Sequence, residues 1–160
     1  MVYFMLCAAI LLIDFFTKYW AKNYLCGLGS IPLWKDVFHL TYVENRGAAF
    51  GILQDKQLFF VIIAVVALAV IVFVMHKYKN KSKILNLGLA FVGAGAAGNL
   101  IDRLTLGFVV DFFDFRLIDF PVFNVADIFV CMGAALVAFF VIFIEEKITK
   151  QPKECDQNAD

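Results

Sequence analysis

The chain has 160 residues, of which 62% are hydrophobic and only 18% are charged, and its formal net charge is zero. Soluble domains are about 45–50% apolar and about 25% charged, so this composition indicates a membrane protein. A neutral chain gives no electrostatic reason to expect a nucleic-acid partner, and the length allows one domain of a few transmembrane helices. The four cysteines include no CxxC pair and the two histidines are far apart in sequence, so neither a disulfide framework nor a zinc site is expected.

The first apolar segment, residues 2–20, is long enough for a spanning helix, which needs about 20 mainly apolar residues. No basic residue precedes it and no small-residue cleavage site follows it, so we interpret it as a retained helix rather than a signal peptide. The next segment, 21–57, contains the β-prone run 38–43, after which Gly47 and Gly51 favour a bend or hairpin. A small sheet is therefore expected in this connection.

Three further segments, 58–75, 84–106 and 125–144, are also apolar enough and long enough to span a membrane. The connection between the second and third helices, residues 77–83, is rich in lysine. Because cytoplasmic loops carry an excess of Lys and Arg, this connection is predicted to be cytoplasmic.

Four spans then place both termini in the cytoplasm and the segments 21–57 and 107–123 outside. The second of these is unusually aromatic, which favours a position at the lipid interface. The predicted fold is an all-α membrane protein with four transmembrane helices and a small extracytoplasmic segment containing β structure. Residues 1–150 form one domain and residues 151–160 form a cytoplasmic tail.

Polar side chains in or beside spanning helices are energetically costly, so each one requires an explanation. With this orientation they all fall at the outer end of the bundle: Asp14, Lys18, Asn99, Asp102, Arg103, Asp111, Asn124 and Asp127. Asp14 and Lys18 are spaced i,i+4 and can pair on one helix face. Polar residues that are merely tolerated would be scattered in depth, so their shared level indicates a functional site.

Asp111 and Asp127 differ from the other carboxylates because neither has a Lys or Arg within four residues. Burial without a local counterion raises proton affinity, and two carboxyl groups that meet in space hold one proton between them. An aspartyl protease uses this state: the ionised carboxylate activates water and the protonated one hydrogen-bonds the oxyanion.

Other protease mechanisms lack the required residues. The two serines have no GxSxG context, no HExxH occurs, and Cys131 has no histidine in the adjoining outer segment.

Each polar feature also has a purely structural interpretation. Asp14 and Lys18 can form only an intrahelical ion pair, and Asn124 with Asp127 can form a helix cap. Small residues at 94 and 98 suit close helix packing, and Cys7 and Cys131 are expected to be packing residues.

Five motifs in this sequence occur in the order of the lipoprotein signal peptidase family, also called signal peptidase II. They are Asp14-Phe-Phe-Thr-Lys18, Asn45-Arg-Gly47-Ala48-Ala49-Phe50, Gly98-Asn99-Leu-Ile-Asp102-Arg103, Val109-Val110-Asp111-Phe112 and Phe123-Asn124-Val-Ala126-Asp127. Each motif alone is weak evidence for the family, but five motifs in register over nearly the whole chain are specific evidence for it. The sequence departs from the family at Ile128, where a small hydroxyl residue is usual, and in a slightly short segment between the two aspartates.

The resemblance implies a protease of the bacterial inner membrane that cleaves prolipoproteins before a diacylglyceryl-modified cysteine, near the outer face. It implies that Asp111 and Asp127 are catalytic. It also implies a larger set that binds the substrate or shapes the site: Asn45, Gly47, Asn99, Arg103, Asn124 and Ala126. Asp14, Lys18 and Asp102 resemble supporting residues, and the motifs leave the exact role of Asp102 relative to Asp111 open.

The expected partners are the lipidated prolipoprotein, membrane lipid and globomycin-like inhibitors. The protein is expected to be a monomer that uses no metal and no organic cofactor. Two other classes of protein fit the polar residues. A small ion- or proton-coupled transporter also carries intramembrane charges, although here the polar groups form no path to the cytoplasm. A non-catalytic assembly subunit would use the same residues for helix packing.

Overall fold

The computed structural model describes residues 1–47, 54, 56–78 and 82–144. Four helices are long and apolar enough to cross a membrane. They are α1 (Val2–Trp20), α2 (Gln57–Lys77), α3 (Lys83–Thr105) and α4 (Val125–Phe143). Their bounds agree with the predicted helices to within two residues, and α1 continues into a π-helical turn, η1 (Ala21–Leu25). The predicted tail, 151–160, and Gly51 lie outside the described residues.

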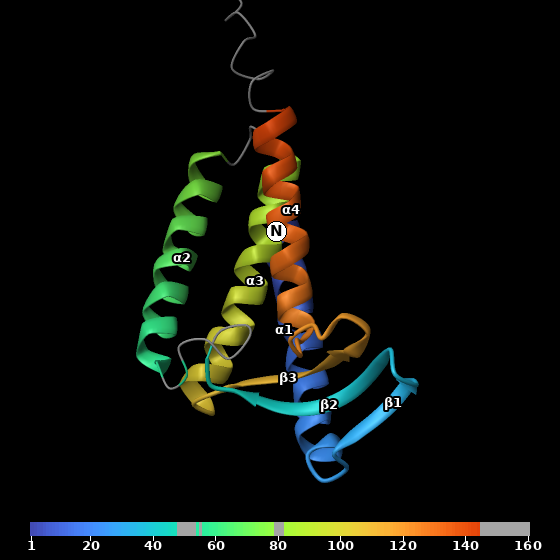
Figure 1. Ribbon diagram of the computed structural model, residues 1–160. Coiled ribbons are helices and arrows are strands. Elements are labelled where there is room, and N and C mark those ends of the chain that lie inside the picture. Colours follow the sequence, from blue (N-terminus) through green and yellow to red (C-terminus); the bar gives the residue numbers. More distant parts are fainter. Residues whose placement is uncertain (48–53, 55, 79–81, 145–160) are drawn as a thin grey trace, which may run out of the picture.

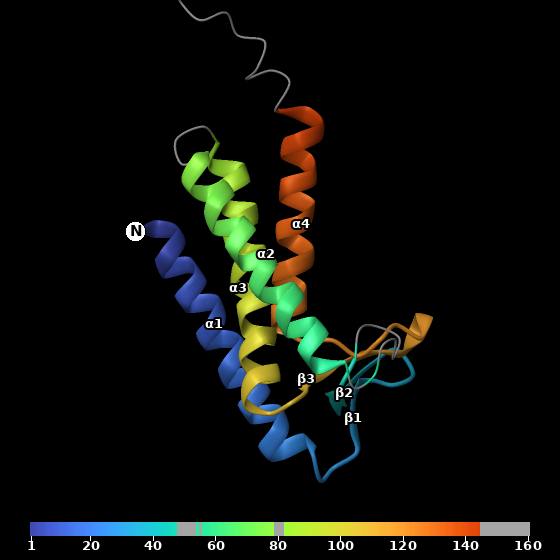
Figure 2. The ribbon, with the colours of Figure 1, turned by 90° about the vertical axis from the view of Figure 1, so that its left-hand side faces the viewer.

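Helix α3 is the centre of the bundle and packs against each of the other three helices (Figures 1 and 2). Its small residues allow this close approach. A side chain at Gly88 would meet the Gly133 carbonyl oxygen of α4 at 2.9 Å, and one at Gly95 would overlap the Ala126 carbonyl. The α3–α4 contact therefore uses Gly88, Gly95 and Gly133 rather than only the predicted pair at 94 and 98. Helix α2 stands apart from α1 and α4 (Figure 1).

A three-stranded antiparallel sheet lies across one end of the helices (Figure 1). Its strands, in the order β1–β2–β3, are Ser30–Trp34, Phe38–Asn45 and Val109–Phe115. The predicted β-prone run 38–43 is thus confirmed as part of β2. A short 3-10 turn, η3 (Arg116–Ile118), follows β3.

The first half of segment 107–123 forms a buried strand, which the sequence did not predict. Val109, Val110, Asp111 and Phe112 are buried, because β3 pairs with β2 and packs against the helices. Phe112 joins a core with Ala21 and Leu25 of η1. The sequence missed this strand because its apolar run shows no alternation of polar and apolar residues, which is the usual signature of a half-exposed strand.

Candidate active site

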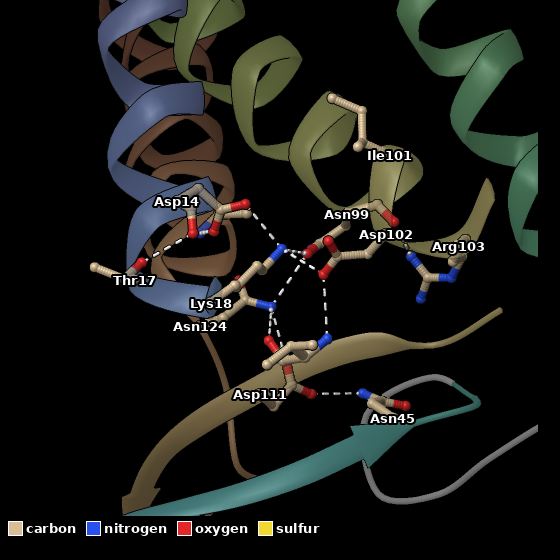
Figure 3. Close-up of polar contacts among 12 residues, drawn as sticks. Asp14, Thr17, Lys18, Asn45, Asn99, Ile101, Asp102, Arg103, Asp111 and Asn124 are labelled. Atoms are coloured by element: carbon tan, nitrogen blue, oxygen red, sulfur yellow. Dashed lines mark hydrogen bonds and ion pairs between the residues drawn. The ribbon is translucent and has the colours of Figure 1, made fainter. Parts of the chain in front are cut away.

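All the intramembrane polar residues identified from the sequence meet at the sheet end of the bundle (Figure 3). Lys18 is their centre. Its ammonium group lies 2.8 Å from Asp14 and 3.0 Å from Asp102, and it donates to the side-chain oxygen of Asn99 at 2.9 Å. Lysine has three N–H donors, so these three partners account for all of them. The predicted i,i+4 pair is confirmed, but it belongs to a network over two helices.

Asp14 and Asp102 each attach a further element to this network. Asp14 accepts a hydrogen bond from the backbone N–H of Ala126 at 2.9 Å, which fixes the first turn of α4 against α1. Asp102 accepts from the backbone N–H of Val110 at 3.1 Å, which fixes β3 against α3. Gly98 makes the arrangement possible, because a side chain there would meet the Asp14 carboxylate at 2.6 Å. These residues therefore support the site rather than line it.

Two asparagines connect the Lys18 network to the two aspartates. Asn99 donates to Asp127 Oδ1 at 2.8 Å, and its own side-chain oxygen faces Lys18. Asn124 donates to Asp111 Oδ1 at 2.7 Å, and its backbone N–H donates to Asp127 Oδ2 at 3.1 Å. Asn45 of β2 donates to Asp111 Oδ2 at 2.9 Å (Figure 3). Each of the four carboxylate oxygens thus accepts one N–H.

Asn124 also forms the predicted helix cap. Its side-chain oxygen accepts from the backbone N–H of Asp127 at 3.0 Å, and Asp127 completes the reciprocal capping box. The structural and the functional interpretation of these two residues are therefore compatible, because the cap orients the Asn124 amide so that its N–H groups face Asp111 and Asn99.

Asp111 is almost completely buried, with 1% of its surface exposed. Burial raises its pKa to about 7, and the nearby charge of Asp127 acts in the same direction. The hydrogen bonds from Asn45 and Asn124 and the charge of Lys18 act in the opposite direction but do not cancel the effect. The sequence argument that Asp111 has raised proton affinity is consistent with this environment.

Both aspartates line one pocket of about 490 Å³ between α3, α4 and β3. Its other polar lining comes from Asn45, Gly47, Asn99 and Arg103. Arg103 donates to the Gly47 carbonyl at 3.3 Å and lies 5.0 Å from the centre of the Phe60 ring. Asn124 and Ala126 are fully buried and do not line the pocket, so they shape the site without reaching a ligand.

The apolar walls of the pocket were not identified from the sequence. They consist of Val109, Phe120, Pro121, Val122, Phe123, Ile128, Cys131 and Met132. Cys131 was expected to be a packing residue, but it is exposed and faces the pocket. The available signal was its spacing, because Cys131 follows Asp127 by four residues and so lies on the same helix face.

The class that these observations define is a membrane protein with a polar site at one end: four helices long enough to span a membrane, together with β3, hold buried Asp111 and half-buried Asp127 in one largely apolar pocket. The family model described as "Signal peptidase (SPase) II" matches residues 6–143. The chain therefore belongs to the signal peptidase II family, and a transporter is not supported.

Individual relatives agree over most of the chain. It is 46% identical to the lipoprotein signal peptidase of Clostridioides difficile (strain 630), over 92% of this chain and 99% of the relative. It is 51% identical to that of Caldanaerobacter subterraneus subsp. tengcongensis, over 85% and 92%. A solved bacterial membrane enzyme is similar in structure, with a TM-score of 0.84 and 30% identity over 96% of this chain and 93% of the other. The chain is accordingly a multi-pass membrane peptidase of the type that removes signal peptides from prolipoproteins.

Proposed function

We propose that this peptidase cleaves prolipoproteins before a diacylglyceryl-modified cysteine, with Asp111 and Asp127 as an aspartyl dyad. The observation that carries the proposal is the shared pocket. It presents both carboxyl groups, each held by one N–H donor per oxygen, beside walls that are mainly apolar. Such walls suit a substrate whose reacting residue carries acyl chains.

The two aspartates have different surroundings, which favours different roles. Asp127 lies in the first turn of α4, where the helix dipole stabilises a negative charge. Asp111 is buried on a strand, and its pKa of about 7 lets it hold a proton near neutral pH. We therefore assign Asp111 as the member that holds the proton and Asp127 as the base that takes a proton from water.

The reaction follows from these roles. Asp127 takes a proton from a water molecule as the water oxygen attacks the scissile carbonyl carbon. Asp111 donates its hydrogen bond to the carbonyl oxygen, which becomes negatively charged. Asp127 then gives its proton to the leaving nitrogen, and the C–N bond breaks. Asn45, Asn99 and Asn124 hold both carboxyl groups in place, so reorganisation during the reaction is small.

The proposed location is the bacterial inner membrane, with both termini in the cytoplasm and the site near the outer face. The lysines among residues 77–83 support this orientation, because α2 ends and α3 begins at the end of the bundle opposite the sheet (Figure 1). There the acyl chains would hold the substrate peptide at the level of the pocket, since each buried methylene contributes about 0.8 kcal/mol. A monomer and competition by globomycin-like peptides belong to the same proposal.

One assay tests the dyad and the substrate class together. Purified protein in liposomes is given matched precursor peptides with and without the diacylglyceryl group. We expect wild type to cleave the lipidated peptide with a kcat/KM higher by several orders of magnitude, because the lipid positions the scissile bond. Asp111→Asn and Asp127→Asn should each abolish cleavage, because asparagine keeps the shape but cannot exchange the proton.

The control is Asp36→Asn, which changes an exposed carboxylate in the turn between β1 and β2. Substantial turnover by either dyad variant would remove that residue from the reaction. Similar rates on the two peptides would show that the lipid is incidental and would argue for a general intramembrane aspartyl protease.

A further inference from the structure

A second polar cluster lies on the sheet, outside the pocket and apart from the Lys18 network. It joins all three strands and η3. The Ser30 hydroxyl lies 3.0 Å from His39 Nδ1 and 2.9 Å from the Thr41 hydroxyl. Arg116 donates to Asp114 Oδ2 at 2.8 Å through Nε and to Ser30 at 2.9 Å through Nη2. We call these five residues the sheet clamp.

The hydrogens of the sheet clamp can be assigned from the available acceptors. Thr41 donates its single hydroxyl hydrogen to Asp114 at 2.7 Å, since a carboxylate only accepts. Ser30 must therefore donate to Thr41, and His39 must donate to Ser30 from Nδ1. The Ser30 oxygen then accepts from both His39 and Arg116. The donors thus form one chain, from His39 and Arg116 through Ser30 and Thr41 to Asp114.

Asp114 is the end of this chain and depends on it. Burial raises the pKa of Asp114, but the hydrogen bonds from Thr41 and Arg116 and the charges of Arg116 and His39 outweigh burial and hold that pKa below its ordinary value. Arg116 is partly exposed, so its ion pair alone contributes little. Its loss nevertheless leaves the largely buried carboxylate of Asp114 with fewer partners, which costs more than losing a surface contact.

The sheet clamp is connected to the active-site pocket through the chain that follows Arg116. Residues 116–123, which we call the wall loop, end in Phe120, Pro121, Val122 and Phe123, and all four line the pocket. The wall loop is attached at its two ends. The backbone N–H of Arg116 donates to the Val37 carbonyl at 2.9 Å, and Phe123 exchanges backbone hydrogen bonds with Phe113 of β3.

Between these ends the wall loop is held mainly by its own short turn: the backbone N–H of Asp119 donates to the Arg116 carbonyl at 3.1 Å, and that of Phe120 donates to the Phe115 carbonyl at 3.2 Å. Leu117 and Ile118 are 64% and 65% exposed, and Asp119 has a left-handed backbone with φ of 49°. The positions of Phe120 and Pro121 therefore depend on the turn that begins at Arg116 and on the attachments of Phe120 and Phe123 to β3. The β3 attachments are backbone bonds, so Arg116 is the side chain through which the sheet can adjust the turn.

We propose that the sheet clamp, through Arg116, is a positioning device that sets the apolar wall of the pocket and hence the affinity for the lipidated substrate. The inference rests on the proposed function and extends it to residues more distant from the carboxyl dyad. The clamp residues touch no reacting atom, so their effect is on substrate binding rather than on proton transfer.

The experiment compares Arg116→Gln, the milder Arg116→Lys, and Ser30→Ala with wild type, using the lipidated precursor in liposomes. We expect Arg116→Gln to raise KM about tenfold while kcat changes less than about threefold, which is the signature of lost binding common to ground and transition states. Arg116→Lys should raise KM less than Arg116→Gln does, because lysine keeps the positive charge but lacks the several planar N–H donors of the guanidinium group. In the double variant of Arg116→Gln with Ser30→Ala, the effect on KM, expressed as a free energy, should be smaller than the sum of the two single effects, because both substitutions break the same network.

Glu44→Gln is the matched control. It breaks a comparable ion pair on the same sheet, between Glu44 and Arg46 at 3.0 Å, which does not hold the wall loop. Its KM should stay at the wild-type value.

A second measurement needs no substrate. Hydrogen–deuterium exchange, resolved by peptide, should rise in residues 116–123 of Arg116→Gln and stay unchanged in α3. Unchanged KM together with unchanged exchange in the wall loop would overturn the proposal, as would an equal loss of kcat in Arg116→Gln and Glu44→Gln. If the chain fails to cleave any lipidated precursor, the proposed function fails, and exchange alone decides whether the clamp holds the wall loop.

Discussion

Lys18 shows how one buried charge can orient a whole site. The residue is 4% exposed, and its three donors face Asp14, Asp102 and Asn99. Because the Asn99 oxygen is taken by Lys18, the Asn99 amide N–H groups must face the other way, toward Asp127. A cation on one helix therefore decides the orientation of the Asn99 amide that donates to Asp127.

The pH dependence of activity should follow Asp111. In the proposed mechanism the protonated form of Asp111 is the active one, so kcat/KM should fall as pH rises through the pKa of about 7. Asn45→Ala removes a hydrogen bond that lowers this pKa, so the alkaline limb should move to higher pH in that variant. A pH–rate profile of both proteins checks this, and a limb that stays in place or moves downward contradicts it.

The same shift has a consequence for stability. The folded-state pKa of Asp111 is above the ordinary value of 3.8, so between these two values the native state holds a proton that the unfolded state has released. The contribution of Asp111 to the free energy of unfolding is therefore fully present below the lower value and is lost as pH rises through about 7.

Asp14→Ala should reduce stability more than chemistry. It removes one partner of a buried ion pair and the acceptor of the Ala126 N–H, and breaking a buried pair costs roughly 3–5 kcal/mol. Thermal unfolding in detergent and kcat of the folded fraction are the two measurements. A variant with normal thermal stability and no activity would place Asp14 in the reaction itself.

At the scale of elements, the contact of α3 with the start of α4 positions Asp127. Gly95 lies against the Ala126 carbonyl, and Ala126 immediately precedes Asp127. The same turn of α4 is held from the other side by Asp14. Small shifts of this contact would move the Asp127 carboxylate relative to Asp111, because helices transmit displacement along their length rather than absorb it.

Gly95→Ala tests this contact. The added methyl would overlap the Ala126 carbonyl, so we expect a loss of about 1–3 kcal/mol and a lower kcat. Gly93→Ala is the matched control on the same helix. Its methyl would meet only the Ile71 side chain at 3.5 Å, an ordinary contact, and stability should be unchanged or slightly higher because alanine favours helix. Equal effects of the two substitutions, measured by thermal unfolding and turnover, would refute a special role of the Gly95 contact.

At the scale of the whole molecule, the sheet and the polar site occupy one end of the bundle, and α2 ends and α3 begins at the other end (Figure 2). Cysteine labelling with a membrane-impermeant reagent tests which end faces outward. The background is a chain whose four native cysteines are replaced. We expect Lys35→Cys, in the exposed turn between β1 and β2, to react in intact cells, and Lys77→Cys to react only after permeabilisation. The reverse pattern would put the site on the cytoplasmic side.

The sequence alone determined the parts of this molecule that depend on local rules. Mainly apolar runs defined the four helices to within two residues, because a bilayer-spanning helix has a required length. The spacing of Asp14 and Lys18 and of Asn124 and Asp127 defined an ion pair and a capping box, since both act within one helical turn. Sparse polar residues at one depth also indicated where the site lies.

Only the tertiary structure decided how these parts meet. The bond between Asp14 and the Ala126 N–H joins residues 112 positions apart, and no local pattern encodes such a contact. The strand β3, the wall loop and the pocket position of Cys131 likewise depend on the path of the chain. Local propensity acts over a few residues, whereas the pocket is formed by backbone segments brought together when helix packing and strand pairing minimise the exposed polar backbone.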